Sequence, residues 1–248
     1  MVILIGTSGW QYDHWRGRFY PGDVPKGRWL EHFAARFPTV EVNNSFYRLP
    51  SEHAFAEWRH RTPDGFVFAV KASRYITHVR RLNDPKEPVD LLWSRARALG
   101  PKLGPVLFQL PPNLPADVER LRGLLAAVPA GMRAALEFRE PSWMVQQVYD
   151  LLNAAGAALV LADHPGARLP DVVTGGWAYI RFHQGQRTAP GYTRDKLRRW
   201  AERITGLPAG DVFVYFNNDT GGAAIEDAYT LTELLAGRGC EVAGPVRA

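Results

Sequence analysis

"TVEVNNSFYRLP", residues 39 to 50, decides the fold, because it begins like a buried strand and yet carries charged and amide groups. Val40 and Val42 stand two residues apart and share one face of a strand, so Glu41 and Asn43 share the other face. A carboxylate inside an apolar core is costly unless it is paired. The stretch therefore predicts a strand that has one face on an apolar core and the other in an interior that holds opposite charges.

Apolar runs of this kind recur along the chain and predict eight strands. We expect them at residues 2–6, 39–43, 66–71, 105–110, 133–138, 158–163, 177–183 and 212–218. Residues with helical spacing follow most of these runs, with Ser51, Ser142 and Thr193 as predicted N-caps and Gly156 and Gly237 as predicted ends. The connection after the sixth run contains "HPGARLPD", which has the composition of a loop.

The alternation of strands with helices predicts an α/β fold with parallel strands and crossover connections. Eight such units in 248 residues match the size of a single (β/α)8 TIM-type barrel. An open doubly wound sheet is the alternative, but it would leave two exposed edges. Because no linker, low-complexity tract or repeat interrupts the chain, we expect residues 1–248 to form one domain.

The polar ends of the predicted strands should meet at one end of the barrel, where barrel enzymes have their active sites. Lys71, for example, continues the register of Val67 and Ala69, so we expect it to lie in the pocket with at least one carboxylate partner. The side chains expected at this end are Glu41, Asn43, Lys71, Gln109, Glu137, Arg139, Asp163, Arg181, His183, Asn217 and Asn218. Such a varied set favours a functional site, and the structural alternative is a layer of salt bridges that only fixes the packing.

These residue types indicate acid–base chemistry on an anion. The cations expected to hold a phosphate or carboxylate are Lys71, Arg139 and Arg181. Glu41 or Glu137 would serve as general base and His183 as acid or proton shuttle. No P-loop, dinucleotide fingerprint, Gly-x-Ser-x-Gly elbow or Cys-x-x-Cys pair occurs, so no motif requires a cofactor. The carboxylates at positions 41, 137 and 163 leave a divalent metal open, although the nearby cations disfavour it.

Composition and charge bound the class of protein. The chain is 46% hydrophobic and 22% charged, with no apolar run long enough to cross a membrane and no basic, apolar leader. One cysteine, Cys240, allows no internal disulfide and fits a cytoplasmic location. The net charge of +5 is local: residues 71–86 have five basic side chains against one acidic, and residues 181–199 have six against one. This basicity indicates an anionic partner or a solvated charged surface.

Two loops are unusual. Residues 8–29, after the first strand, contain six aromatic side chains in 22 residues. This long loop is either a stacking wall for a base or sugar or a cap with its own small core. After the last strand, Gly221 and Gly222 precede a predicted helix, and such an N-terminus can receive a phosphate.

The assembled motifs resemble the YecE-like family, also known as domain of unknown function 72. They follow the family's order from residue 3 to about 235: "IGTSGWQYDHWRGRFYP", "TVEVNNSFYRLP", "FVFAVKASRYITH", "LGPVLFQLPP", "ALEFREPSW", "YIRFHQG" and "VYFNND". The resemblance implies a (β/α)8 barrel and assigns no reaction. The matching motif residues are Trp10, Glu41, Asn43, Tyr47, Arg48, Lys71, Thr77, His78, Gln109, Pro111, Glu137, Arg139, Trp143, Asp163, Arg181, His183, Asn217 and Asn218. The chain departs from the family pattern at Gln184, which separates His183 from a glycine, and at Asp227, where the family usually has asparagine.

Together these features predict an enzyme that acts on a small or terminal anionic substrate at the barrel mouth. Besides the polar strand ends, the residues expected to bind this substrate are Trp10, Tyr47, Arg48 and His78. The alternative from another class is a nucleic-acid-binding or processing-accessory protein that uses the basic stretches and the aromatic loop, with weak binding of single strands. A third alternative is a ligand-binding scaffold whose polar ring is structural.

Overall fold

Eight parallel strands close into a barrel in the computed structural model, which describes residues 1–164, 172–184 and 189–247. Each strand pairs with its sequence neighbours, and β1 pairs with both β8 and β2, which closes the ring. The strands are β1 (Val2–Ser8), β2 (Thr39–Val42), β3 (Val67–Lys71), β4 (Leu103–Gln109), β5 (Ala134–Glu137), β6 (Ala158–Asp163), β7 (Ala178–Phe182) and β8 (Asp211–Phe216). The predicted TIM-type barrel is therefore confirmed.

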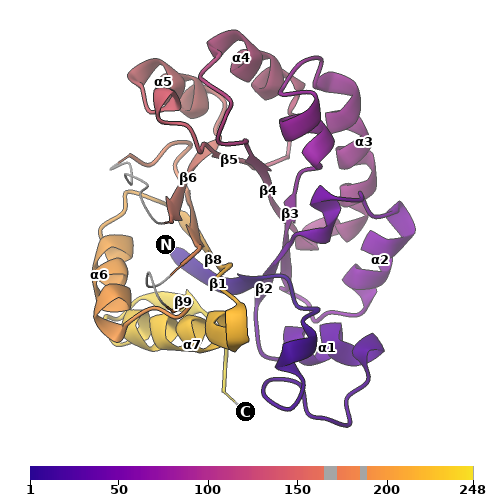
Figure 1. Cartoon of the computed structure of the whole chain (residues 1–248), viewed down its shortest axis with the longest axis vertical. Coiled ribbons are helices and arrows are strands. Elements are labelled where there is room, and N and C mark those ends of the chain that lie inside the picture. The colour runs from indigo at the N-terminus through magenta and orange to yellow at the C-terminus, as the bar shows by residue number, and fades with distance from the viewer. Residues whose placement is uncertain (165–171, 185–188, 248) are drawn as a thin grey trace.

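Helices surround the ring of strands (Figure 1). They are α1 (Trp29–Ala34), α2 (Glu52–His60), α3 (Lys86–Ala96), α4 (Val118–Ala127), α5 (Gln146–Ala154), α6 (Arg194–Thr205) and α7 (Ala223–Ala236). Ser51 and Thr193 cap α2 and α6 by accepting the backbone N–H of Ala54 and Lys196, as predicted. In the described residues no helix joins β6 to β7, and most of "HPGARLPD" lies outside those residues.

One predicted cap is wrong. Ser142 lies in a short 3-10 helix, Pro141–Trp143, and its hydroxyl bonds to Glu140 instead of to a helix N-terminus. Helix α5 begins at Gln146, after Val145, which makes no side-chain capping bond. The 3-10 helix forms here because Pro141, its first residue, has φ fixed near the helical value. Ser142 is then inside this helix and is not available to cap α5.

Barrel closure depends on a close approach of β1 and β2. A Cβ atom at Gly6 would lie 2.2 Å from the carbonyl oxygen of Thr39, so only glycine fits there. The two strands pair only near their C-terminal ends, through Thr7 and Ser8. A ninth strand, β9 (Glu241–Ala243), pairs with the N-terminal part of β1. It occupies the edge of β1 that β2 is too short to cover. Figure 1 shows β9 beside α7.

Buried apolar side chains form two separate clusters. The larger one lies between the strands and the helices and includes Val40 and Val42. The smaller one fills the barrel and contains Ala69, Leu107, Ala135, Tyr179 and Tyr215 among others. The alternation read from residues 39–50 therefore places the valines outside the barrel wall and residues 41 and 43 on its inner face.

The aromatic side chains of the loop after β1 pack against α1 and are part of the larger, outer cluster. Trp15 and Tyr20 are fully buried, and Tyr20 stacks on Trp29 with 4.5 Å between ring centroids. Phe19 packs edge-on against Phe33 at 6.0 Å. Buried rings cannot offer a stacking surface to a ligand, so the burial of Trp15 and Tyr20 disfavours the stacking-wall interpretation for these two residues.

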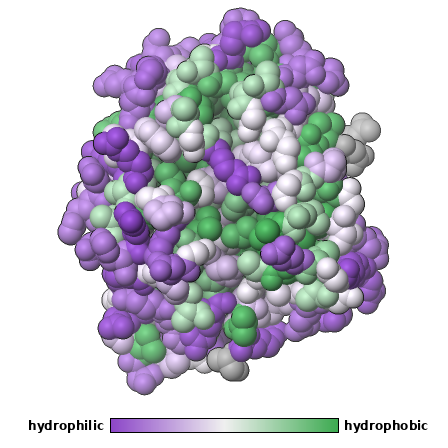
Figure 2. Space-filling view, turned by 180° about the vertical axis from the view of Figure 1, so that it is seen from behind, coloured by the Kyte–Doolittle hydropathy of each residue, from purple (hydrophilic) through white to green (hydrophobic). Residues whose placement is uncertain are grey.

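The outer surface is mixed. In the face opposite to that of Figure 1, hydrophobic and neutral residues run over the middle while hydrophilic residues dominate the periphery (Figure 2). None of the helices in the described part of the chain has both the length and the hydrophobicity for crossing a membrane.

Candidate functional site

The polar ends of the strands gather at the C-terminal end of the barrel, and strand register brings them to similar heights. Ser8 lies beside Glu41 across the β1–β2 pair, and Gln109 lies beside Glu137 across the β4–β5 pair. Arg181 follows Tyr179 on the inner face of β7. Inside a barrel such neighbours can also reach across the lumen, so the contacts among them define the site.

Arg181 is the centre of this cluster and is 1% exposed. Its Nη2 donates to Glu41 Oε1 at 2.7 Å, and its Nη1 donates to Glu137 Oε2 at 2.5 Å. Nη1 also lies 3.1 Å from Gln109 Oε1. One guanidinium from β7 thus ties together β2, β4 and β5. Burial disfavours its charge, but the two carboxylates outweigh burial and raise the pKa of Arg181.

Glu41 is completely buried and fully paired. Oε1 accepts from Ser8 Oγ at 2.7 Å as well as from Arg181, and Oε2 accepts from the hydroxyl of Tyr179 at 2.6 Å. Burial alone would raise the pKa of Glu41, but Arg181 and these hydrogen bonds hold it below its usual value. The carboxylate is therefore ionised and already satisfied, which disfavours the predicted role as general base.

Glu137, also fully buried, links Arg181 to the more open part of the cluster. Its Oε1 accepts from Nε of Arg139 and lies 3.4 Å from His183 Nε2. Burial opposes ionisation, yet Arg181, His183 and Arg139 together hold the pKa of Glu137 well below its usual range. This carboxylate is a permanent anion placed behind a histidine.

His183 bridges β5 and β8. Its Nε2 lies 3.1 Å from Nη2 of Arg139, and its Nδ1 lies 3.1 Å from Nδ2 of Asn217. The imidazole side chain is 12% exposed. Burial lowers the pKa of His183, although the hydrogen bond to Glu137 opposes this shift. The ring is therefore predominantly neutral at pH 7 and able to accept a proton.

Lys71 differs from the other cations of the cluster. Its Nζ donates to Gln109 Oε1 at 2.9 Å and lies 4.2 Å from the centroid of the Phe46 ring. Among the described residues it forms no ion pair, so the expected carboxylate partner is a wrong prediction. The reason is that Arg181 and Arg139 already occupy the carboxylates of Glu41 and Glu137. Burial, aided by Arg181, lowers the pKa of Lys71 to about 8.

Asn43 adds an unused acceptor directly after β2. It follows β2 on the inner face, and its buried Oδ1 has no hydrogen-bond partner among the described residues. A buried amide oxygen without a partner is costly, because it has lost water and gained nothing. Asn43 is therefore a candidate ligand contact.

Four of the predicted binding residues lie near or outside the rim. Tyr47 is 76% exposed and Arg48 is also exposed. His78 is half-buried, and its ring lies edge-on to Phe46 with 5.0 Å between centroids. Burial lowers the pKa of His78, and the nearby charge of Lys71 lowers it further. Trp10 is 4% exposed in the outer core, edge-on to Trp58 at 5.3 Å. A buried indole in the outer core does not fit the predicted binding role.

Asp163 and Asn218 face the helices and not the lumen. Asp163 pairs with Lys196 Nζ at 2.9 Å and accepts from Trp200 Nε1 at 2.9 Å, both on α6. Asn218 donates to Asp227 at 2.6 Å on α7. Strand alternation explains both positions, because Ala162 and Asn217 occupy the adjoining inward positions. The prediction that these two residues join the site is not supported by their contacts.

Three contributors were missed by reasoning from the sequence. Tyr179 is not among the predicted site residues, yet its hydroxyl donates to Glu41, and burial raises its pKa. Ser8 and Phe46 stand at a strand end and in the loop after β2, where they contact Glu41 and Lys71. The available signal for Tyr179 was its position two residues before Arg181, on the same inward face of the predicted strand.

The described residues contain no group of three or more histidine, cysteine, aspartate or glutamate side chains placed to hold a metal ion. The two buried carboxylates face the guanidinium of Arg181 instead.

Several cations of the two basic stretches have partners within the chain. Arg80 lies 3.5 Å from Asp84, and Arg81 donates to the carbonyl oxygen of Asn113 at 2.7 Å. In the second stretch, the pairs are Arg194 with Glu233 at 3.6 Å, Lys196 with Asp163, and Arg198 with Asp195 at 2.5 Å. Arg187 lies outside the described residues. Together with the burial of Trp10 and Trp15, these pairs disfavour the predicted positive rim with an aromatic wall.

Comparisons with known proteins agree with this architecture. A family model described as "Protein of unknown function DUF72" matches residues 4–247. The UPF0759 protein YunF of Bacillus subtilis is 28% identical, over 94% of this chain and 95% of its own length. The crystal structure of a DUF72 family protein from Thermotoga maritima is 27% identical with a TM-score of 0.86, over 95% of this chain and 100% of that one. One from Enterococcus faecalis, 21% identical, has a TM-score of 0.82 over 94% of this chain and 95% of its own, and shows the fold alone.

Proposed function

The chain belongs to the DUF72 family, whose description assigns no activity, and we propose from the geometry of its barrel mouth that it is an enzyme acting on a small anionic substrate. Lys71 and Arg139 would bind the anionic group, and His183 would transfer a proton. Arg181 would act as a positioning residue, because both of its terminal nitrogens are occupied by buried carboxylates.

The observation that carries this proposal is the charge balance of the cluster. Two buried carboxylates, Glu41 and Glu137, are satisfied by the two guanidiniums of Arg181 and Arg139. Lys71 is then a surplus cation that is partly desolvated and pairs with no carboxylate among the described residues. An arrangement that served packing alone would gain by pairing or removing that charge. An anion bound at Lys71 would complete the balance.

The acid–base role of His183 follows from its partners. Since its pKa is lowered, the neutral ring can take a proton from a substrate at neutral pH. The imidazolium that forms would lie 3.4 Å from the buried anion of Glu137, which stabilises it. Asn217, 3.1 Å from the other ring nitrogen, fixes the orientation of the ring. The base predicted among the carboxylates is therefore better assigned to the histidine.

Thermal unfolding with a panel of small anions tests the proposal. We expect inorganic phosphate, small phosphate monoesters or short carboxylates to raise Tm, because ligands that bind only the folded state stabilise it. Lys71→Met should abolish that rise. Lys86→Met is the matched control, because Lys86 is exposed on α3 and pairs with Asp90.

The outcome that rejects the proposal is equally direct. If no anion in the panel raises Tm, or if the rise survives in Lys71→Met, the cluster serves packing and the enzyme assignment fails. For any bound compound that is converted, His183→Gln should reduce kcat while leaving Kd near the wild-type value.

A further inference from the structure

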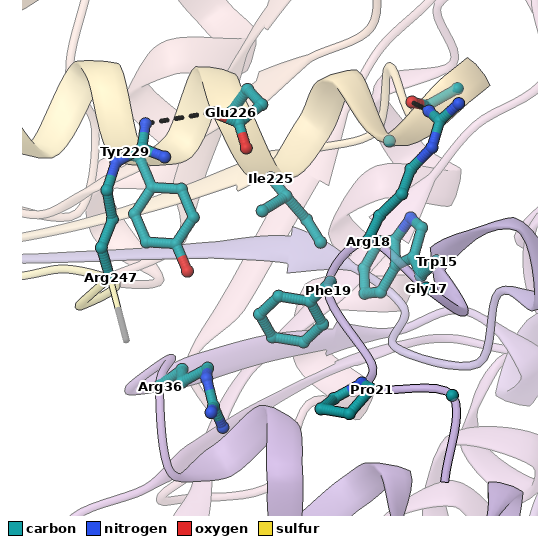
Figure 3. A pocket seen from close by; sticks show the side chains of 13 residues that line it. Trp15, Gly17, Arg18, Phe19, Pro21, Arg36, Ile225, Glu226, Tyr229 and Arg247 are labelled. Atoms are coloured by element: carbon teal, nitrogen blue, oxygen red, sulfur yellow. Dashed lines mark hydrogen bonds and ion pairs between the residues drawn. The ribbon is translucent and has the colours of Figure 1, made fainter. Parts of the chain in front are cut away.

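A cavity lies between the loop after β1 and helix α7 and shares no lining residue with the cluster around Arg181 (Figure 3). Its volume is about 590 Å³, which is within the range of small-molecule sites, roughly 300–1,000 Å³. Along α7 it extends from Gly222 to Tyr229, a rise of about 10 Å at ~1.5 Å per residue. The proposed chemistry at the mouth makes no use of this groove.

The middle of the groove is apolar. Ile225 and Tyr229 point into it from one turn to the next of α7, and Phe19 faces them from the loop (Figure 3). Ile225 is 5% exposed and Tyr229 is 7% exposed, so both belong to the packed core while forming the floor of the cavity. Such a floor favours an aliphatic or aromatic body.

The cationic residues of the groove are at its ends. Arg18 is at one end and Arg36 and Arg247 are at the other, so that Ile225 and Phe19 lie between them (Figure 3). Arg247 covers the Tyr229 ring at 4.3 Å and pairs with Glu226 at 3.0 Å. Burial raises the pKa of Tyr229, and the positive charges of Arg247 and Arg36 oppose that shift.

Arg36 is the cation best placed to receive a ligand charge. It is half-buried, and its Nη1 donates to the carbonyl oxygen of His32 at 3.1 Å. Within the described residues it forms no ion pair with a carboxylate, and the same holds for Arg18. The groove therefore combines an apolar floor with guanidinium donors that the chain itself leaves without a counter-ion.

We propose that this groove binds an amphiphilic anion, a small molecule with an apolar chain or ring and one carboxylate. The apolar body would lie along Phe19, Ile225 and Tyr229. The carboxylate would be at Arg36, next to the Tyr229 hydroxyl. Charge complementarity selects the anion and the apolar floor selects its body. The site is separate from the one at Lys71, so this inference stands or falls independently of the proposed function.

Titration calorimetry with three matched compounds tests the inference: octanoate, octan-1-ol and acetate. We expect octanoate to bind at least tenfold more tightly than octan-1-ol, which lacks the charge, and than acetate, which lacks the chain. Arg36→Gln should weaken octanoate at least tenfold. Arg122→Gln, which alters an exposed arginine on α4 that pairs with Glu119, should leave the affinity unchanged.

Two more variants separate this groove from other sites. Arg247→Gln should also weaken the binding of octanoate. This variant tests the groove if Arg36→Gln does not fold. Lys71→Met should have no effect on octanoate. The inference is overturned if octanoate and octan-1-ol bind equally, if the Arg36 and Arg247 variants bind like the wild type, or if Lys71→Met removes the binding. It is also overturned if sedimentation shows a dimer that Arg247→Gln dissociates, because a second copy would then occupy the groove.

Discussion

A lysine in a buried cluster usually gains a carboxylate, and Lys71 is notable because its neighbour is an amide oxygen. Burial disfavours the charged form of the Lys71 amine, Arg181 adds to this effect, and no ion pair among the described residues compensates for it. The pKa of Lys71 therefore falls to about 8. A lysine in this state is suited to bind an anion that restores the lost interaction, and its ammonium would then regain a pKa above 8.

The lowered pKa of Lys71 predicts how stability changes with pH. Between about pH 8 and the ordinary lysine value of 10.5, the unfolded chain binds this proton and the folded chain does not, so stability contributed by Lys71 rises with pH. Below pH 8 both states are protonated, and the folded state bears the cost of the buried charge. We therefore expect Lys71→Met to be more stable than the wild type at pH 7, by about 1–3 kcal/mol.

Urea unfolding of the wild type and Lys71→Met at pH 7 and pH 9.5 measures this difference. The gap between the two proteins should narrow at the higher pH. Anion binding should weaken over the same interval, since the neutral amine offers no charge. A gap that stays constant from pH 7 to 9.5 would show that the amine does not titrate in this range.

Arg181 predicts the opposite response to loss of charge. Its replacement by methionine leaves Glu41 and Glu137 without the guanidinium that neutralises them inside the barrel. Removing one partner from a buried pair costs about 3–5 kcal/mol, and we expect at least that loss in the free energy of unfolding. Adding Glu41→Gln and Glu137→Gln should restore part of the stability, because the unpaired charges are removed. Equal stability of the single and triple variants would contradict the pairing.

At the scale of elements, barrel closure rests on the β1–β2 contact. Gly6→Ala would place a Cβ atom 2.2 Å from the carbonyl oxygen of Thr39, so the strands must separate, and we expect a loss of about 1–3 kcal/mol. Gly123→Ala is the matched substitution: in α4 its Cβ would meet no atom within 4 Å, and helix propensity predicts a gain of about 0.5–1 kcal/mol. Urea denaturation of both variants checks the pair, and similar effects would refute the steric argument.

Much of the element structure could be predicted because its signals are local. Ser51 and Thr193 cap their helices through bonds to residues three positions away, and the alternation around Glu41 is visible in five residues. Strand β9 could not be predicted in this way. It is three residues long, half exposed, and exists because the short β2 leaves an edge of β1 to be paired.

The site was predictable as a set of side chains but not as a set of contacts. Inward register placed Arg181, Glu41 and Glu137 at one end of the barrel. The sequence does not show that the guanidinium of Arg181 satisfies both carboxylates and leaves Lys71 without either. These contacts depend on distances across the barrel lumen. The outward positions of Asp163 and Asn218 follow from the same alternation. They were missed because every polar residue at a strand end was taken to point inward.

For the whole molecule, the two ends of the barrel have different chemistry. At the end opposite the mouth, Arg133 lies over Trp177 at 4.5 Å and Phe213 at 5.0 Å and pairs with Asp211 at 2.9 Å. That end has two aromatic rings beneath a partly exposed ion pair. Lys71, the cation without an ion pair among the described residues, lies at the C-terminal end, where barrel enzymes have their active sites.

The distribution of charge over the whole molecule also predicts how the protein treats polyanions. A net charge of +5 attracts a nucleic acid strand at low salt, but most cations of the two basic stretches are engaged by the chain. Few phosphates could then be neutralised, so few counterions would be released and the binding would be weak. We expect a labelled oligothymidylate to show weak binding by fluorescence anisotropy at low salt and none near physiological salt.

Charge reversal separates this weak binding from that at the mouth. Arg80→Glu with Arg198→Glu should remove the residual oligonucleotide binding, because both residues are on the surface away from the strand ends. The same double variant should retain the stabilisation by a small anion, which depends on Lys71. Binding of the oligonucleotide that resists salt, in a protein that no small anion stabilises, would reverse the ranking of the two functions. The surplus charge of Lys71 would then serve a polymer, even though Trp10 and Trp15 are buried and Arg194 and Arg198 are paired with carboxylates.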